Sequence, residues 1–153
     1  MAEKSFYARG LRFSCTRCSR CCRHEPGFVF LSSGDLRLLA EGLKMEYTDI
    51  MEKWCRWVPR ESGIPRKGSG RVFELSLAEK PNYDCVFWRD GCTVYAHRPL
   101  QCRTFPFWDR NLSPGVWEAL DCPGAGKGEL HGPAYIEDCL RRRRAEPVLA
   151  REA

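Results

Sequence analysis

Four thiols lie within eight residues in the stretch Cys15-Thr16-Arg17-Cys18-Ser19-Arg20-Cys21-Cys22. Each Cys-x2-Cys interval lets one turn of backbone aim two sulfurs at a common point, a geometry that tetrahedral zinc and iron–sulfur clusters both use. Cys15, Cys18 and Cys21 fit this interval twice over. The spacing therefore predicts a metal site rather than a set of unrelated buried thiols.

Cys22 does not continue the same pattern, because it follows Cys21 directly. The side chains of adjacent residues point in different directions whether the backbone is extended or helical. We therefore expect Cys21 and Cys22 to bind different metals, or different corners of one cluster.

Length and composition limit the fold. The chain has 153 residues with 43% hydrophobic content, which suits one globular domain with a modest core. We expect a small single α+β domain over residues 1–140, with short helices and a β-hairpin organised around a cysteine-ligated metal site. A basic, flexible tail is expected over residues 141–153.

Cysteine usage and the start of the chain indicate the compartment. The ten cysteines form a smaller share of the chain than in short secreted disulfide scaffolds. The first residues lack the apolar core of a signal peptide, and no apolar run is long enough to span a membrane. We therefore expect a cytoplasmic protein with no membrane partner, in which clustered cysteines serve as ligands or catalytic thiols.

Charge and known motifs exclude several classes of function. Residues 141–153 carry +3 of the net charge of +5, so the remainder is too weakly basic for a nucleic-acid surface. A Ser-His-Asp set, a His-Glu-x-x-His helix and a paired-carboxylate motif are not recognisable, so no specific reaction follows. Arg17, Arg20 and Arg23 either donate hydrogen bonds to the sulfurs or are solvated surface residues.

A second cysteine region begins at Cys85. The β-prone runs Cys85-Val-Phe-Trp and Cys92-Thr-Val-Tyr are joined through Asp90-Gly91, which predicts a hairpin. With a two-residue turn, Cys92 would face Arg89, and Cys85 and Cys92 would lie roughly 13 Å apart. Either the hairpin is distorted, or the two cysteines bind different metals or different corners of a cluster.

Two arginines flank the next cysteine in the block His97-Arg98-Pro99-Leu100-Gln101-Cys102-Arg103. This block predicts a short helix with Pro99 at its first position, from which Cys102 projects. Arg98 and Arg103 would tune a metal site or hold a small anionic substrate. The alternative is a pair of structural salt bridges.

The remaining elements follow from periodicity and capping. The sequence predicts helices from Ser32 to Gly42, from Thr48 to Val58 and from Pro133 onwards, a strand over 71–77, and loops over 24–27 and 63–70. Cys55 and Cys139 lie on apolar helical faces and are expected to be core thiols. The aromatic run 105–108 is expected in the core or as a shield for the metal. The glycines after Cys122-Pro123 predict a metal-wrapping loop, because they let backbone N–H groups approach sulfur.

With these residues in view, the chain resembles the YkgJ-type cysteine-cluster family, described as a zinc- or iron-chelating CxxCxxCC domain. The resemblance rests on the run 15–22, the Cys85 and Cys92 runs, the block from His97 to Phe107, and Cys122 before glycines. Relatives often have a glycine between the first cysteines, within the stretches 16–17 and 19–20. The resemblance implies eight ligand candidates: Cys15, Cys18, Cys21, Cys22, Cys85, Cys92, Cys102 and Cys122.

The metal and the function are then narrowed to a few alternatives. Zinc and iron–sulfur clusters both accept four thiolates, but the Cys-x2-Cys-x2-Cys run favours one [4Fe-4S]-type site, with any second metal on the remaining thiols. The protein would then be a redox component or a component of a metal-dependent enzyme, such as an oxidoreductase or a transferase. The alternative is a zinc-binding structural or interaction module. The family is also similar to the cysteine-rich part of longer flagellin lysine methylases, which makes a protein lysine methylation partner a minor alternative. A substrate-sized pocket beside Cys102 would favour an enzyme.

Overall fold

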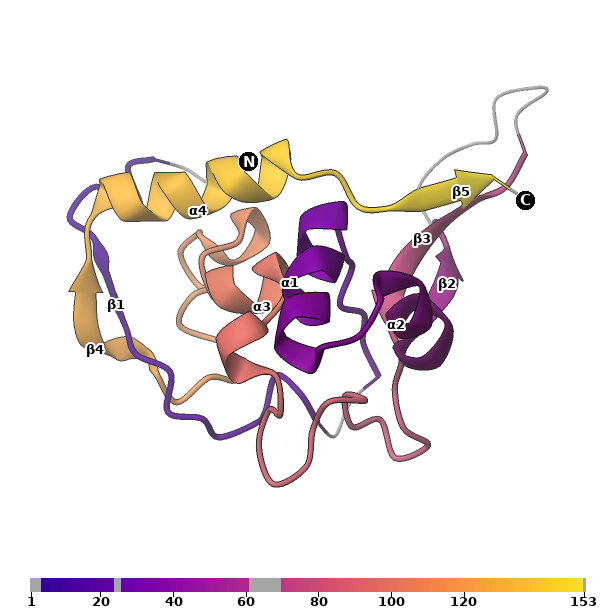
Figure 1. Ribbon diagram of the computed structural model, residues 1–153. Helices are drawn as coiled ribbons and strands as arrows, with labels where there is room; N and C mark the ends of the chain where they lie inside the picture. The colour runs from indigo at the N-terminus through magenta and orange to yellow at the C-terminus, as the bar shows by residue number, and fades with distance from the viewer. Residues whose placement is uncertain (1–3, 24–25, 61–69, 153) are drawn as a thin grey trace. The chain divides into compact units, whose positions relative to one another are not determined.

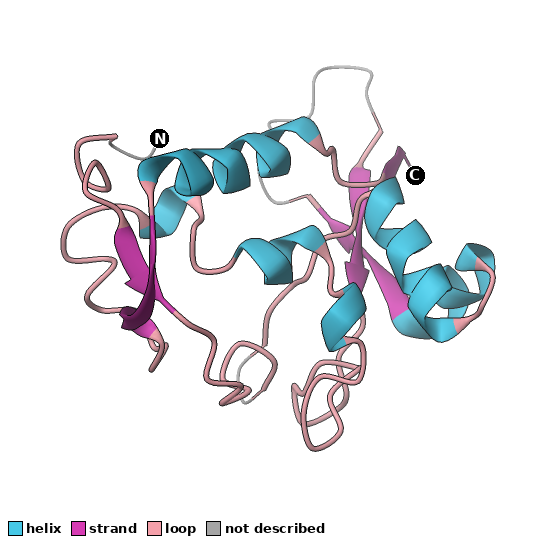
Figure 2. Ribbon diagram, turned by 60° about the vertical axis from the view of Figure 1, so that its left-hand side comes forward, coloured by secondary structure: helices cyan, strands magenta, loops and turns pink. Residues whose placement is uncertain are grey.

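The computed structural model describes residues 4–23, 26–60 and 70–152. Within these residues the chain forms four α-helices and five β-strands, and the strands make two antiparallel sheets. This arrangement confirms the α+β class (Figures 1 and 2). Residues 24–25 of the turn predicted over 24–27, and residues 63–69 of the loop predicted over 63–70, lie outside the described residues. Contacts divide the chain into a first unit, Met1–Cys21 with Arg103–Ala145, and a second unit, Cys22–Cys102 with Glu146–Ala153.

The first unit contains a two-stranded sheet and one long helix. β1 (Leu11–Phe13) pairs antiparallel with β4 (Ala125–His131), and α4 (Pro133–Ala145) follows β4 (Figure 1). As predicted, this helix begins at Pro133, where a missing backbone N–H costs nothing. The buried core of the unit comprises Tyr7, Phe107, Leu112, Trp117, Ile136, Cys139 and Leu140.

Three of these seven buried residues are aromatic: Tyr7, Phe107 and Trp117. Phe107 lies at the centre of the core, with ring centroids 6.0 Å from Phe13, 5.9 Å from Trp117 and 5.3 Å from His131. Aromatic rings at these separations add attraction beyond the area that they bury. The run 105–108 therefore supplies core residues, as predicted.

The second unit is built on a three-stranded sheet. Its order is β2-β3-β5, formed by β2 (Cys55–Pro59), β3 (Val72–Leu77) and β5 (Ala150–Glu152). Two helices, α1 (Ser33–Leu43) and α2 (Tyr47–Trp54), complete the core with the sheet. The buried residues of this core are Leu31, Leu36, Leu39, Ile50, Leu75, Leu77, Phe87 and Val94.

Asp35 connects the start of α1 to the segment that carries Cys102. Ser32 caps the helix in a capping box with Asp35, as the sequence predicted. The other carboxylate oxygen of Asp35 accepts a 2.8 Å hydrogen bond from the amide of Leu100, the first residue of α3 (Leu100–Thr104). Because Asp35 is 3% exposed, this bond is shielded from water and fixes the start of α3 to the start of α1.

Three segments differ from the sequence prediction. The predicted helix over 48–58 ends at Trp54, because Cys55 begins β2 and pairs with Leu77. Where a tail was predicted, α4 continues to Ala145 with Arg144 bound to Asp109 at 2.6 Å, and residues 150–152 pair with β3.

None of the described helices combines the length and the apolar character needed to cross a bilayer.

Candidate metal centre

Four of the eight candidate ligands belong to the first unit: Cys15, Cys18, Cys21 and Cys122. The two-stranded sheet brings their loops together, because Phe13 at the end of β1 pairs with Ala125 at the start of β4. The amide of Ser14 donates a 3.4 Å hydrogen bond to the carbonyl of Gly124. The residue before Cys15 therefore lies against the loop that carries Cys122.

Gly124 makes this close approach possible. A Cβ atom at this position would lie 2.0 Å from the carbonyl oxygen of Ser14, so no larger residue fits without backbone movement. Farther along the same loops, Arg20 forms an ion pair with Asp121, the residue before Cys122. The first cysteine loop is thus held to the Cys122 loop at both ends.

Backbone amides face the sulfurs of these loops. The amide of Arg17 donates to Sγ of Cys15 at 3.4 Å. Burial raises the pKa of the Cys122 thiol, the nearby thiols of Cys18 and Cys21 raise it further, and N–H groups of Gly124 and Ala125 lower it. Amide donors of this kind stabilise thiolate sulfur, the form that binds metal.

Two residues of the first cysteine loop have left-handed backbone conformations. Arg17 has φ 56° and Ser19 has φ 67°, a region that glycine adopts most readily. Left-handed residues also turn successive N–H groups into concave nests, which bind anions and iron–sulfur clusters.

The other four candidates belong to the second unit: Cys22, Cys85, Cys92 and Cys102. The amide of Cys85 donates a 2.7 Å hydrogen bond to the carbonyl of Cys22. One residue farther, Nε of Arg23 donates to the carboxylate of Asp84 at 3.1 Å, and its guanidinium lies 3.7 Å from the ring centre of Trp88. The segment that carries Cys22 is therefore docked on the segment that carries Cys85.

The hairpin predicted for residues 85–95 does not form as a regular ladder. Cys92 pairs with Trp88 across a three-residue loop and not with Arg89, and the amide of Trp88 folds back to the carbonyl of Cys85 at 2.8 Å. Asp90 and Gly91 both have positive φ, as the predicted Asp-Gly turn requires. The structure therefore has the distorted alternative, and Cys85 and Cys92 pack against the same core.

The two arginines next to Cys102 fall in different units. Arg98 belongs to the second unit, where its Nε donates to the carbonyl of Tyr95 at 2.9 Å and its guanidinium stacks over the Tyr95 ring. Arg103 belongs to the first unit. A joint role of Arg98 and Arg103 beside one metal stays a prediction.

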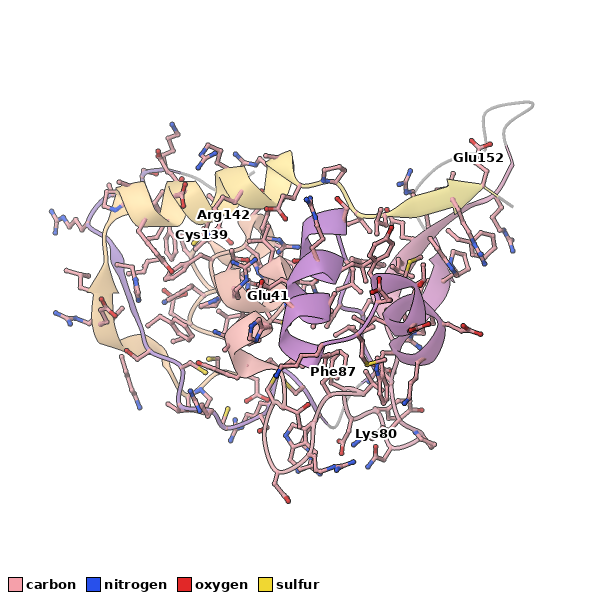
Figure 3. All side chains as sticks on the ribbon, in the orientation of Figure 1. Glu41, Lys80, Phe87, Cys139, Arg142 and Glu152 are labelled. Carbon is pink, nitrogen blue, oxygen red and sulfur yellow. The ribbon has the colours of Figure 1, made fainter. Side chains whose placement is uncertain are left out.

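Cys55 and Cys139 are packed in cores, as expected of thiols that are not ligands. Cys139 is 3% exposed and lies on the buried face of α4 (Figure 3). Cys55 packs against the core of the second unit, and burial raises the pKa of its thiol to about 11. Burial raises the pKa of the Cys139 thiol as well, so the fold favours the neutral form of both thiols.

Sequence reasoning missed the acidic partners of the cluster arginines. Arg20 and Arg23 bind Asp121 and Asp84 and are not simply solvated. The signal was the dipeptide Asp-Cys, which occurs at 84–85 and again at 121–122. Each copy thus connects a downstream cysteine to an arginine of the N-terminal cluster.

The donor set suits a metal, but the structure does not show a preformed site. Among the described residues, no three Cys, His, Asp or Glu side chains are arranged to hold a metal ion. The fit is therefore chemical: each unit contains four of the eight candidate thiols, the number that zinc and iron–sulfur clusters take. A hollow of about 340 Å³ lies beside Cys122, lined by Trp117, Glu118, Leu120, Cys122, Pro123, Ala125, Gly126 and Lys127.

Comparisons with known proteins agree with this chemistry. The model of a family named CxxCxxCC, described as a "Putative zinc- or iron-chelating domain", matches residues 14–123, which include all eight candidate cysteines. The chain is 24% identical over 129 residues to an uncharacterized protein of Methanocaldococcus jannaschii. That alignment covers 80% of this chain and 63% of the relative, so the chain spans less than two thirds of the relative's length. No solved structure matches the chain significantly.

Proposed function

Because the chain belongs to the CxxCxxCC family of zinc- or iron-chelating domains, we propose that this metal-binding protein carries a [4Fe-4S]-type cluster and serves as a redox component. The proposed ligands are the four thiols of the first unit. The observation that carries the proposal is the pairing of the Cys15–Cys21 loop with the loop of Cys122-Pro123. Three cysteines at Cys-x2-Cys-x2-Cys spacing with a distant Cys-Pro resemble the ligand pattern of bacterial ferredoxins.

The residues around these thiols suit a negatively charged centre. Cys15, Cys18, Cys21 and Cys122 would hold the iron, and the amides of Arg17, Gly124 and Ala125 offset the charge on sulfur. The exposed ion pair between Arg20 and Asp121 lies where the two loops meet, and their close approach at Ser14 and Gly124 holds them together. A bound cluster supplies one-electron transfer, with a potential that depends on hydrogen bonds to sulfur and on solvent exposure.

Exposure at this centre favours electron exchange with a partner. Cys15, Cys18 and Cys21 are exposed, whereas Cys122 is half-buried. Electron transfer needs the centre close to the surface, and a thiol rim open to solvent provides this. The proposed partner is a redox protein that docks against the first cysteine loop.

A second candidate function is catalysis at the metal, which the hollow beside Cys122 favours. Its volume of about 340 Å³ lies within the range of small-molecule sites, and its lining carries one cation, Lys127, and one carboxylate, Glu118, for binding a polar substrate. This candidate differs from electron transfer in one respect. A small molecule would have to perturb the spectrum of the cluster, and Lys127→Gln would weaken that effect.

The test of the main proposal is the composition of protein purified without oxygen. We expect about four iron and about four sulfide per chain, a brown colour, and a paramagnetic signal after reduction. Cys18→Ser and Cys122→Ser should lose iron and sulfide together. Wild-type protein that contains zinc but no acid-labile sulfide would overturn the iron–sulfur proposal and leave a zinc-binding module.

A further inference from the structure

We infer that the eight cysteines form two separate four-thiol metal sites, Cys15, Cys18, Cys21 and Cys122 in the first unit and Cys22, Cys85, Cys92 and Cys102 in the second, and that the second site takes a single zinc ion. This inference rests on the proposed binding of metal by thiolates and assigns each thiol to one site.

The boundary between the units passes between Cys21 and Cys22. Adjacent side chains diverge, so these two sulfurs reach a common metal only with difficulty. A second boundary follows Cys102 within α3, and Cys102 is assigned to the second site by this boundary. Four candidate thiols therefore fall on each side, which is the full set for one tetrahedral ion or one cluster.

Ion pairs and backbone hydrogen bonds follow the same partition. Arg20, which precedes Cys21, binds Asp121, which precedes Cys122. Arg23, which follows Cys22, binds Asp84, which precedes Cys85. Each half of the adjacent pair Cys21-Cys22 is thus tied to its own downstream Asp-Cys dipeptide.

The chemistry of the second site indicates zinc. Its thiols come from separated positions, and Cys85 and Cys92 pack against an apolar core, as in closed structural sites. The hydrogen bond of 2.7 Å joins the backbones of Cys22 and Cys85 directly. Neighbours of this kind can bring their sulfurs to the separation of about 3.8 Å that tetrahedral zinc with Zn–S bonds of about 2.3 Å requires.

The region around Cys22 is also more firmly held than the first cysteine loop. Asp84 is 4% exposed and accepts hydrogen bonds from both Arg23 and Asn82. Trp88 covers the guanidinium of Arg23. We call Arg23, Asp84 and Trp88 the clamp around Cys22. Contacts of this kind fix the orientation of neighbouring ligands, which is the usual role of residues around a structural metal.

Metal analysis of matched variants tests the inference. Wild-type protein should hold about one zinc beside the metal of the first site. Cys22→Ser and Cys85→Ser should lose that zinc and keep the first-site metal, whereas Cys21→Ser and Cys122→Ser should do the reverse. Equal losses of both metals in Cys21→Ser and Cys22→Ser would overturn the partition.

A measurement on the unmodified protein covers the case in which variants fail to fold. X-ray absorption at the zinc edge should show about four sulfur neighbours at about 2.3 Å. Fewer sulfurs, or zinc absent from folded protein, would overturn the second site. Two zinc ions per chain, lost one at a time as the partition predicts, would support it and refute only the iron–sulfur proposal.

Discussion

Cys85 and Cys22 are joined by a 2.7 Å hydrogen bond from the amide of the first to the carbonyl of the second. This contact ties the last cysteine of the N-terminal cluster to a segment far along the chain. The flanking pair of Arg23 and Asp84 adds a second tie at 3.1 Å. The two contacts together bring Cys22 and Cys85 into the same unit.

The clamp around Cys22 should control how tightly the second site holds its metal. Asp84→Asn removes the charge that Arg23 faces, and we expect zinc to dissociate about 10-fold faster. Asp121→Asn is the matched control, because the side chains of Asp121 and Arg20 are 81% and 52% exposed. Exposed pairs contribute little, so its effect on either metal should stay below about 3-fold. Transfer of zinc to a chelator measures both rates, and equal rates in the two variants would contradict the clamp.

Gly124 should be required for the first site. In Gly124→Ala, the added Cβ meets the backbone of Ser14 at 2.0 Å and forces the two loops apart. We expect a loss of about 2 kcal/mol of stability and a first site that releases metal more readily. Gly132→Ala is the control in the same unit, because its Cβ meets nothing within 4 Å. Urea unfolding and metal content check the prediction, which fails if the two variants behave alike.

Cys55 and Cys139 should be dispensable for metal binding. Cys139→Ala is expected to cost about 2 kcal/mol of unfolding free energy and Cys55→Ala about 1 kcal/mol, because Cys139 is buried and Cys55 only partly so. Both variants should keep the full metal content of the wild-type protein. A stoichiometric loss of metal in either one would show that the set of eight ligands is wrong.

The thiol of Cys55 should make stability depend on alkaline pH. Burial raises its pKa from 9.0 to about 11, so the fold favours the neutral thiol. Its contribution should be complete below about pH 9 and should be lost as the pH rises towards about 11, because only the unfolded chain ionises in this window. The gap in unfolding free energy between wild type and Cys55→Ala should narrow over this range. A gap that does not change with pH would contradict the prediction.

Removal of metal should unfold much of the chain. Cys22, Cys85, Cys92 and Cys122 lie in segments that are neither α-helix nor β-strand. Bound metal would therefore contribute much of the free energy that keeps these segments folded. The reduced, metal-free protein should lose several kcal/mol of stability and expose aromatic surface, as circular dichroism and dye binding would report. Unchanged spectra and thermal stability after complete removal would show that metal is not structural.

Local features of this protein were readable from the sequence. The capping box of Ser32 and Asp35, the start of α4 at Pro133, the strand near Val72 and the Asp-Gly turn depend on interactions within a few residues. The residues that make these interactions are close together in the sequence, so the local sequence alone is enough to predict them. Tertiary contacts did not override them. The spacing of Cys15, Cys18 and Cys21 is local in the same sense.

Only the tertiary structure showed which distant segments lie against the two ends of the cysteine run. Side-chain direction alone separated Cys21 from Cys22, but it named no partner for either. The partners follow from Phe13 with Ala125, and from Cys22 with Cys85, contacts whose members are far apart in the chain. Sequence spacing carries no information about such pairs, because the free energy that selects them comes from packing the whole of each unit.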